Sequence, residues 1–70
     1  MHLICKQIKD NYWELFEKDV LCARVMLKND KFYSFTQNCY VATSDSFEDA
    51  IESLKDYKLY HIEEDKYTYL

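Results

Sequence analysis

The stretch of residues 12–35 constrains the fold most, because it contains three apolar segments separated by two short polar breaks. The breaks are Lys18-Asp19 and Asn29-Asp30, and two polar residues between β-type segments are typical of a tight hairpin. Asn and Asp suit such turns because their side chains bond the local backbone and tolerate left-handed conformations. The stretch therefore predicts a three-stranded antiparallel meander.

The flanking sequence extends this meander into a single α+β domain over residues 1–70. Ser46 suits a helix N-cap, and apolar residues recur at helical spacing from Phe47 to Leu54. The predicted elements are strands at about 3–8, 12–17, 20–28 and 32–41, a helix at about 46–57, and a short strand or hairpin at 59–70. We therefore expect a small antiparallel sheet of four to five strands, with one helix packed on one face, in the order ββββα before the last element.

The two hairpins also predict which residues lie opposite each other, because antiparallel partners sum to a constant. A regular first hairpin pairs Phe16 with Leu21, Glu14 with Ala23, and Trp13 with Arg24. The second hairpin pairs Leu27 with Phe32, Val25 with Ser34, Met26 with Tyr33, and Arg24 with Phe35. Trp13 and Arg24 are then close enough to stack. In the first strand, alternation predicts that Ile4 and Ile8 face the core.

Both faces of the predicted meander are hydrophobic, and this is the main reason to expect binding. One helix covers only one face of a sheet, so aromatic and aliphatic side chains are left over on the other face. Tyr, Trp, Met and Arg are enriched in protein interfaces. We therefore predict that Trp13 and Tyr33 contact a protein partner or a second copy of the chain.

Charge is distributed unevenly along the chain, whose formal net charge is −4. Residues 1–44 carry six basic and five acidic side chains, whereas residues 45–70 carry three basic and eight acidic ones. The eight acids, which we predict as partner-binding residues, are Asp45, Glu48, Asp49, Glu52, Asp56, Glu63, Glu64 and Asp65. Five of them line the outer face of the predicted helix, which is either an ordinary solvated face or a stripe that imitates nucleic acid toward a basic surface.

No motif for catalysis or for a bound group stands out in the sequence. The chain has no Gly and no Pro, which excludes the glycine loops that cradle phosphates. Cys5, Cys22 and Cys39 are evenly spaced and lack the close pairs that are typical of structural zinc ligands. We therefore predict no catalytic residue, no metal and no cofactor, and a chain that is not an enzyme.

These observations favour a small acidic, non-catalytic protein-binding module. Its most concrete form is an inhibitor or nucleic-acid mimic that acts on a basic nucleic-acid-binding host protein. Lys outnumbers Arg eight to one, and Tyr, Phe, Asn, Ile and Asp are plentiful; all of these residues have A/T-rich codons. In its small size, its acidity and this composition, the chain resembles phage accessory proteins that block host defence enzymes, including anti-CRISPR proteins. The alternative is a small structural homo-oligomer that associates through its uncovered aromatic sheet face.

The same observations predict the kind of partner and the compartment. The expected partner is a protein with a basic surface, or a second copy in a homodimer. Direct nucleic-acid binding would rest on Lys6, Lys9, Lys18, Arg24, Lys28 and Lys31. The near-neutral sum of residues 1–44 argues against it. No apolar run approaches the ~20 residues that span a bilayer, and the odd cysteine count favours the cytoplasm, which is the host cytoplasm for a phage protein.

Overall fold

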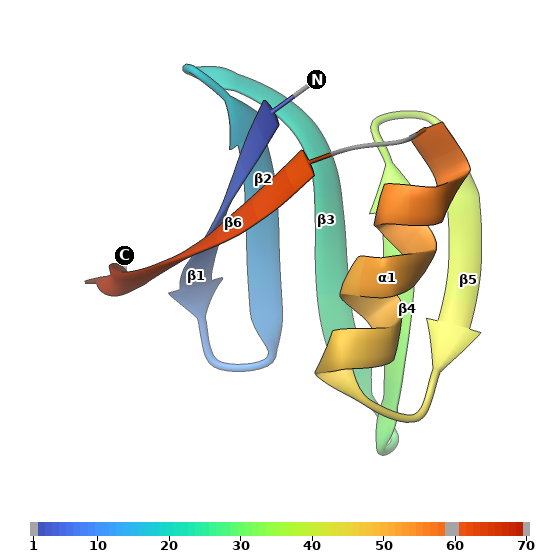
Figure 1. The fold of residues 1–70 in the computed structure, drawn as a ribbon. Coiled ribbons are helices and arrows are strands. Elements are labelled where there is room, and N and C mark those ends of the chain that lie inside the picture. Colours follow the sequence, from blue (N-terminus) through green and yellow to red (C-terminus); the bar gives the residue numbers. More distant parts are fainter. Residues whose placement is uncertain (1, 59–60, 70) are drawn as a thin grey trace.

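The computed structural model describes residues 2–58 and 61–69, and side chains for residues 2–58, 61 and 62. The elements are β1 (His2–Lys9), β2 (Tyr12–Glu17), β3 (Val20–Lys28), β4 (Lys31–Thr36), β5 (Tyr40–Ser44), α1 (Phe47–Lys58) and β6 (His61–Tyr69). Figure 1 shows a curled sheet with α1 in front of β4. The predicted α+β fold, a meander followed by one helix and a last strand, is confirmed.

The sheet has six strands in the order β5-β4-β3-β2-β1-β6. Neighbours from β1 to β5 are antiparallel, whereas β6 pairs in parallel with β1. The single strand predicted at 32–41 is wrong, because the chain bends at residues 37–39 and divides it into β4 and β5. The last element was predicted at 59–70, and over its described residues, 61–69, it is one strand and not a hairpin. It lies at the opposite edge of the sheet from β5. The two edge strands therefore precede and follow α1 in the chain.

The hairpin turns form without glycine because other residues adopt positive φ. Asn29 and Asp30 have φ of 52° and 65°, the pair of left-handed conformations that joins two strands tightly. Asn11 and Lys18, with φ of 65° and 55°, serve the two earlier turns. The turns predicted at 18–19 and 29–30 are therefore confirmed.

The helix starts where the sequence predicts. The Ser46 side-chain Oγ accepts a hydrogen bond from the Asp49 backbone N–H at 3.1 Å, and its carbonyl accepts one from the Ala50 N–H at 3.1 Å. This is N-capping, which satisfies amide groups that have no partner inside the helix. Ala50 and Leu54 are buried on the side that faces the sheet.

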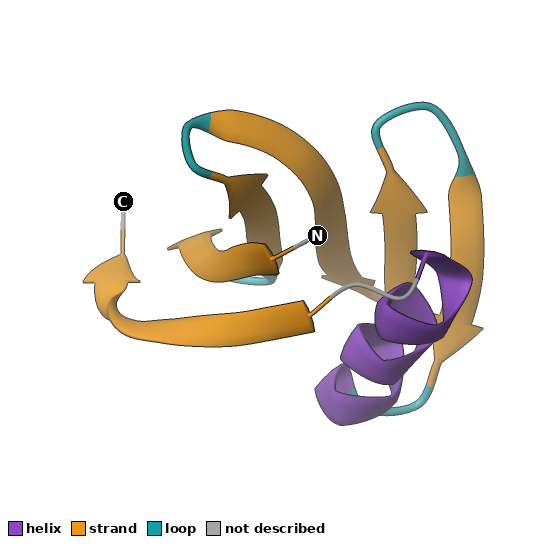
Figure 2. Ribbon diagram, turned by 45° about the horizontal axis from the view of Figure 1, so that its top comes forward, coloured by secondary structure: helices purple, strands orange, loops and turns teal. Residues whose placement is uncertain are grey.

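The core lies on the side of the sheet that curls around α1 (Figure 2). Its fully buried hydrophobic residues are Leu3, Cys5, Leu15, Ala23, Val25, Ala50 and Leu54. Ser34 is also buried, and its hydroxyl donates to the Ala50 carbonyl at 3.2 Å, which joins β4 to α1. The prediction that Ile4 and Ile8 face the core is wrong, because the other set of alternating β1 residues does so.

A bulge in the first hairpin shifts its register. Phe16 pairs with Leu21 as predicted, but Leu15 pairs with Ala23, so one additional residue of β3 is accommodated between these pairs. Glu14 consequently faces Arg24, and Trp13 faces Val25; the predicted pairs Glu14–Ala23 and Trp13–Arg24 are wrong by one residue. All four predicted pairs of the second hairpin are confirmed.

Candidate binding surfaces

The acidic residues of α1 lie on its outer side. Glu48, Asp49, Glu52 and Asp56 are exposed, whereas the buried residues of the helix face the sheet. From Glu48 to Asp56 this stripe rises by about 12 Å along the helix axis. It is therefore a continuous row of carboxylates within α1, as the sequence predicts.

Asp45 lies apart from this stripe, because it precedes the helix. Its Oδ1 accepts a hydrogen bond from Lys31 Nζ at the start of β4. This contact lowers the pKa of Asp45 below its ordinary 3.8 and raises the pKa of Lys31 above its ordinary 10.5. Asp45 and Lys31 thus form an exposed ion pair between the entry of α1 and the sheet.

The other three predicted acids, Glu63, Glu64 and Asp65, belong to β6. Their backbone pairs with β1 at the sheet edge, but their side chains lie outside the described residues. The prediction that all eight acids share one surface therefore stays a prediction.

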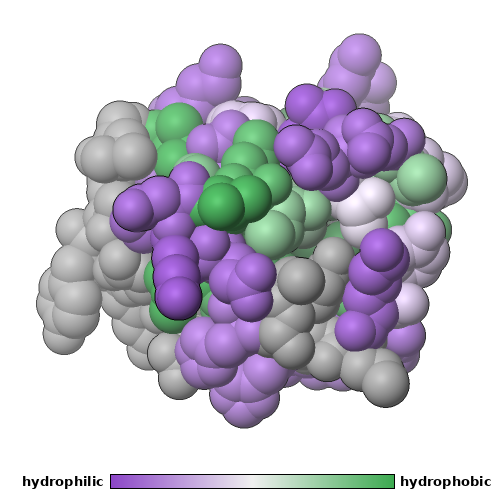
Figure 3. Space-filling model, turned by 90° about the horizontal axis from the view of Figure 1, so that it is seen from above, coloured by the Kyte–Doolittle hydropathy of each residue, from purple (hydrophilic) through white to green (hydrophobic). Residues whose placement is uncertain are grey.

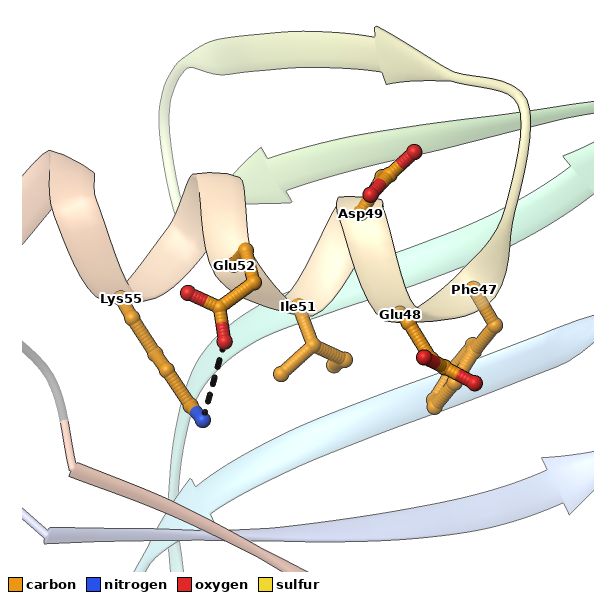
Figure 4. A pocket seen from close by; sticks show the side chains of 6 residues that line it. All are labelled: Phe47, Glu48, Asp49, Ile51, Glu52 and Lys55. Carbon is orange, nitrogen blue, oxygen red and sulfur yellow. Dashed lines mark hydrogen bonds and ion pairs between the residues drawn. The ribbon is translucent and has the colours of Figure 1, made fainter.

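A shallow pocket of about 290 Å³ lies along α1 (Figure 4). Phe47 and Ile51 supply apolar surface, and Glu48 and Glu52 supply carboxylates beside it. Lys55 Nζ contacts Glu52 Oε1 at 3.4 Å, at one end of the pocket. Both partners of this ion pair are largely exposed, and such pairs contribute only about 0 to 1 kcal/mol, so an incoming cation can displace Lys55.

The second candidate surface is the open face of the sheet, on the side away from α1. Cross-strand pairing defines it by two rows of residues that run from β1 to β5. The first row is Lys6, Glu14, Arg24, Phe35 and Tyr40, and the second is Lys9, Tyr12, Met26, Tyr33 and Thr43. The pairs Ile4–Phe16 and Lys28–Lys31 continue the face at its two ends. Among the described side chains of β1 to β5, cations and aromatic rings therefore predominate on this side.

Cations lie over rings at three places on the open face. Lys6 Nζ is 5.7 Å from the centre of the Phe16 ring, and Lys9 Nζ is 5.7 Å from that of Tyr12. Arg24 Cζ is 5.0 Å from the centre of the Phe35 ring, as a cation–π contact requires. Arg24 thus stacks on Phe35, and the predicted stacking on Trp13 is wrong.

Glu14 is the one carboxylate in the rows and pairs just described. It accepts a hydrogen bond of 2.7 Å from the Tyr12 hydroxyl, and it faces Arg24 across the strands. Burial, and then the bond to Glu14, raise the pKa of Tyr12 above its ordinary 10.0, while the nearby Arg24 opposes the rise. Glu14 is therefore engaged within the face.

The structure separates the two aromatic residues that the sequence grouped together. Tyr33 lies on the open face, in its second row. Trp13 lies on the helix side, where its ring centre is 4.8 Å from that of Phe47. Since the bulge moves Trp13 to the core side, only Tyr33 remains on the surface where a partner was expected.

The thiols and imidazoles lie in different places. Cys22 and Cys39 line one depression with Tyr57, and none of the described residues around it is a histidine. His2 and His61 instead contact each other at the β1–β6 edge, with ring centres 4.8 Å apart. Among the described residues, no three His, Cys, Asp or Glu side chains are grouped as metal ligands would be.

Comparison of the chain with protein-family models, curated proteins and solved structures found no significant match. Within the described part of the chain, α1 is too short and too polar to cross a bilayer. Figure 3 views the molecule from the end that carries the β2–β3 turn, where small hydrophobic patches are surrounded by hydrophilic residues.

Sequence reasoning named the cations of the open face but set them aside because the summed charge of residues 1–44 is nearly neutral. The signal was present as alternation within single strands, for example Arg24, Met26 and Lys28 in β3, and Lys31, Tyr33 and Phe35 in β4. Summing charge over residues 1–44 hides this pattern, because the acids of that stretch lie mostly in turns and at strand ends.

Proposed function

We propose that the protein is a non-catalytic protein-binding module that presents α1 to a basic surface of its partner. The observation that carries the proposal is the pocket in which Glu48 and Glu52 flank the apolar side chains of Phe47 and Ile51. An Arg or Lys of the partner fits this arrangement, because its aliphatic stem packs on apolar surface while its charged head reaches a carboxylate.

The exposed carboxylates of α1 extend this recognition beyond one side chain. Asp56 and Asp49 continue the stripe, which supplies a row of negative charge along the helix. Basic surfaces that bind nucleic acid recognise such rows of negative charge, and complementary charge also accelerates encounter. A basic nucleic-acid-binding protein is therefore the partner class that we propose, with the protein acting as its inhibitor, as phage-encoded anti-defence proteins do.

The proposal places the protein in the cytoplasm, which is the host cytoplasm for a phage protein. The free thiols of Cys22 and Cys39 are typical of a reducing compartment. Defence enzymes that bind nucleic acid act in the same compartment.

Affinity capture from a nuclease-treated lysate tests the proposal, because nuclease removes nucleic acid that bridges two proteins. The variant Glu48→Lys/Glu52→Lys should lose the partner that the wild-type protein captures. The matched control Glu17→Lys/Asp19→Lys changes net charge equally at the end of β2 and should keep it. Equal capture by both variants would refute a role for α1.

A second candidate function, self-association, is favoured by one feature of the sheet edge. The edge strand β5 contains no charged residue and no proline, the two devices that usually protect an edge from pairing with another strand. Antiparallel pairing of two β5 strands about Ala42 would bring no like charges together. Sedimentation velocity of the wild-type protein and of Thr43→Lys tests this candidate: a dimer that the substitution dissociates supports it, and a wild-type monomer at high concentration excludes it.

A further inference from the structure

We propose that the open face of the sheet binds single-stranded nucleic acid. This inference does not depend on the proposed role of α1, which lies on the other side of the sheet. The inference follows from the basic side chains of the face and from the aromatic rings beside them. Strand pairing places both kinds of side chain on this side of the sheet.

Among the described side chains of β1 to β5, the face is basic although the protein is acidic. Lys6, Lys9, Arg24 and Lys28 lie in its rows or at its end, together with Lys31, which bonds Asp45. Lys31 is paired with Asp45, so four other cations stand against the single carboxylate of Glu14 among the described side chains of β1 to β5. At the β1 edge, the backbone of β6 pairs Glu63 with Ile4 and Asp65 with Lys6. A face with this balance complements a polyanion, and phosphate groups are the usual partners of such clusters of Lys and Arg.

Aromatic rings lie next to these cations on the face. Phe16, Tyr12 and Phe35 each have a cation within 6 Å of the ring centre. Tyr40 is 58% exposed and packs edge-on against Phe35, with ring centres 5.9 Å apart. Sheet surfaces that carry exposed rings and basic side chains stack successive bases while neutralising the backbone between them.

This combination selects a single strand over other polyanions. A duplex keeps its bases paired and stacked, so it offers phosphates but no base to an aromatic ring. An acidic peptide offers carboxylates but no planar groups. Only a single strand uses both the cations and the rings of the face. The summed charge of residues 1–44 argued against such binding, but alternation along the strands places five of its cations on one face.

Fluorescence anisotropy with a labelled oligodeoxythymidine of about 12 nucleotides tests the proposal, since single-strand-binding domains of the OB fold occupy ~4–16 nucleotides. We expect saturable binding at low salt that weakens as salt rises. Arg24→Gln and Lys6→Gln should each reduce the slope of log affinity against log salt by about 0.7, the value for one phosphate contact on a single strand. Tyr40→Ala should weaken binding about tenfold through loss of stacking.

Lys58→Gln is the matched control, because it removes one positive charge at the end of α1 and should leave affinity unchanged. Far-UV circular dichroism checks that each variant is folded, and two separate cation variants keep the test decisive if one of them unfolds. Absence of binding, or equal loss in Lys58→Gln and Arg24→Gln, overturns the proposal. Equal competition by polyglutamate shows a docking site for acidic protein and overturns it too, as does equal competition by a duplex of the same length.

Discussion

Trp13 on β2 and Phe47 at the start of α1 hold their rings 4.8 Å apart, tilted by 44°. Phe32 on β4 lies 5.9 Å from the first ring and 6.1 Å from the second, so one cluster joins two strands and the helix. Trp13→Ala should therefore lower the free energy of unfolding by about 3 kcal/mol, the lower end of the range for large aromatics, because Trp13 is partly buried against the core. Urea unfolding measures this loss. Tyr40→Ala is the control, with an expected change of about 0.5 kcal/mol; similar losses in both variants would contradict this packing.

Lys18 has φ of 55°, a conformation that costs most non-glycine residues about 1 kcal/mol. Lys18→Gly should relieve this strain and stabilise the protein by about 0.5 kcal/mol, because glycine's larger unfolded-state entropy offsets part of the gain. Thermal unfolding measures the shift. Lys18→Ala removes the same charge without relieving the strain, so a melting temperature at or above that of Lys18→Gly would show that the turn is not strained.

The Tyr12 hydroxyl should titrate above its ordinary pKa of 10.0, mainly because of burial and then because of its bond to Glu14. A raised pKa means that this group stabilises the fold below pH 10 and that the contribution is lost as pH rises through the folded-state value. Glu14→Gln should lower the pKa of Tyr12, whereas Glu17→Gln should leave it unchanged. An NMR titration of the Tyr12 ring carbon measures the pKa of Tyr12. A Tyr12 pKa in Glu14→Gln equal to that in the wild type would contradict the contact.

The Lys31–Asp45 contact predicts a pH window for stability at the entry of α1. Because the pKa of Asp45 is lowered, its contribution is present above the ordinary value of 3.8 and is lost as pH falls through the folded-state pKa. Because the pKa of Lys31 is raised, the stabilising contribution of the contact is lost only as the pH rises above 10.5. Asp45→Asn should therefore melt below the wild type at neutral pH and together with it in strong acid. A constant difference across the acid range would show that the ion pair is not its source.

Local features of the sequence predicted the turns and the helix, because each is decided by a few adjacent residues. Asn29-Asp30 forms the second hairpin turn, and Ser46 caps α1. No local sequence feature predicts the bulge in β3, because packing between strands determines where an additional residue is accommodated. A one-residue shift exchanges the faces of a strand, which is why Trp13 lies on the core side.

The binding surfaces were predictable to different degrees. The carboxylates of α1 follow from helical periodicity, so Glu48 and Glu52 were identified correctly as exposed. The pocket between them required the structure, because it depends on how Phe47 and Ile51 sit against the sheet. The open face required the register of five strands, which composition alone does not determine.

The most direct test of the central proposal is the salt dependence of affinity for the captured partner. We predict that the affinity of the wild-type protein falls as salt rises, and that Glu48→Lys/Glu52→Lys binds more weakly with a flatter dependence. The control Glu17→Lys/Asp19→Lys should keep the wild-type affinity at moderate salt. Affinity of the α1 variant equal to that of the wild type across the whole series would contradict the proposal that this helix recognises a basic partner.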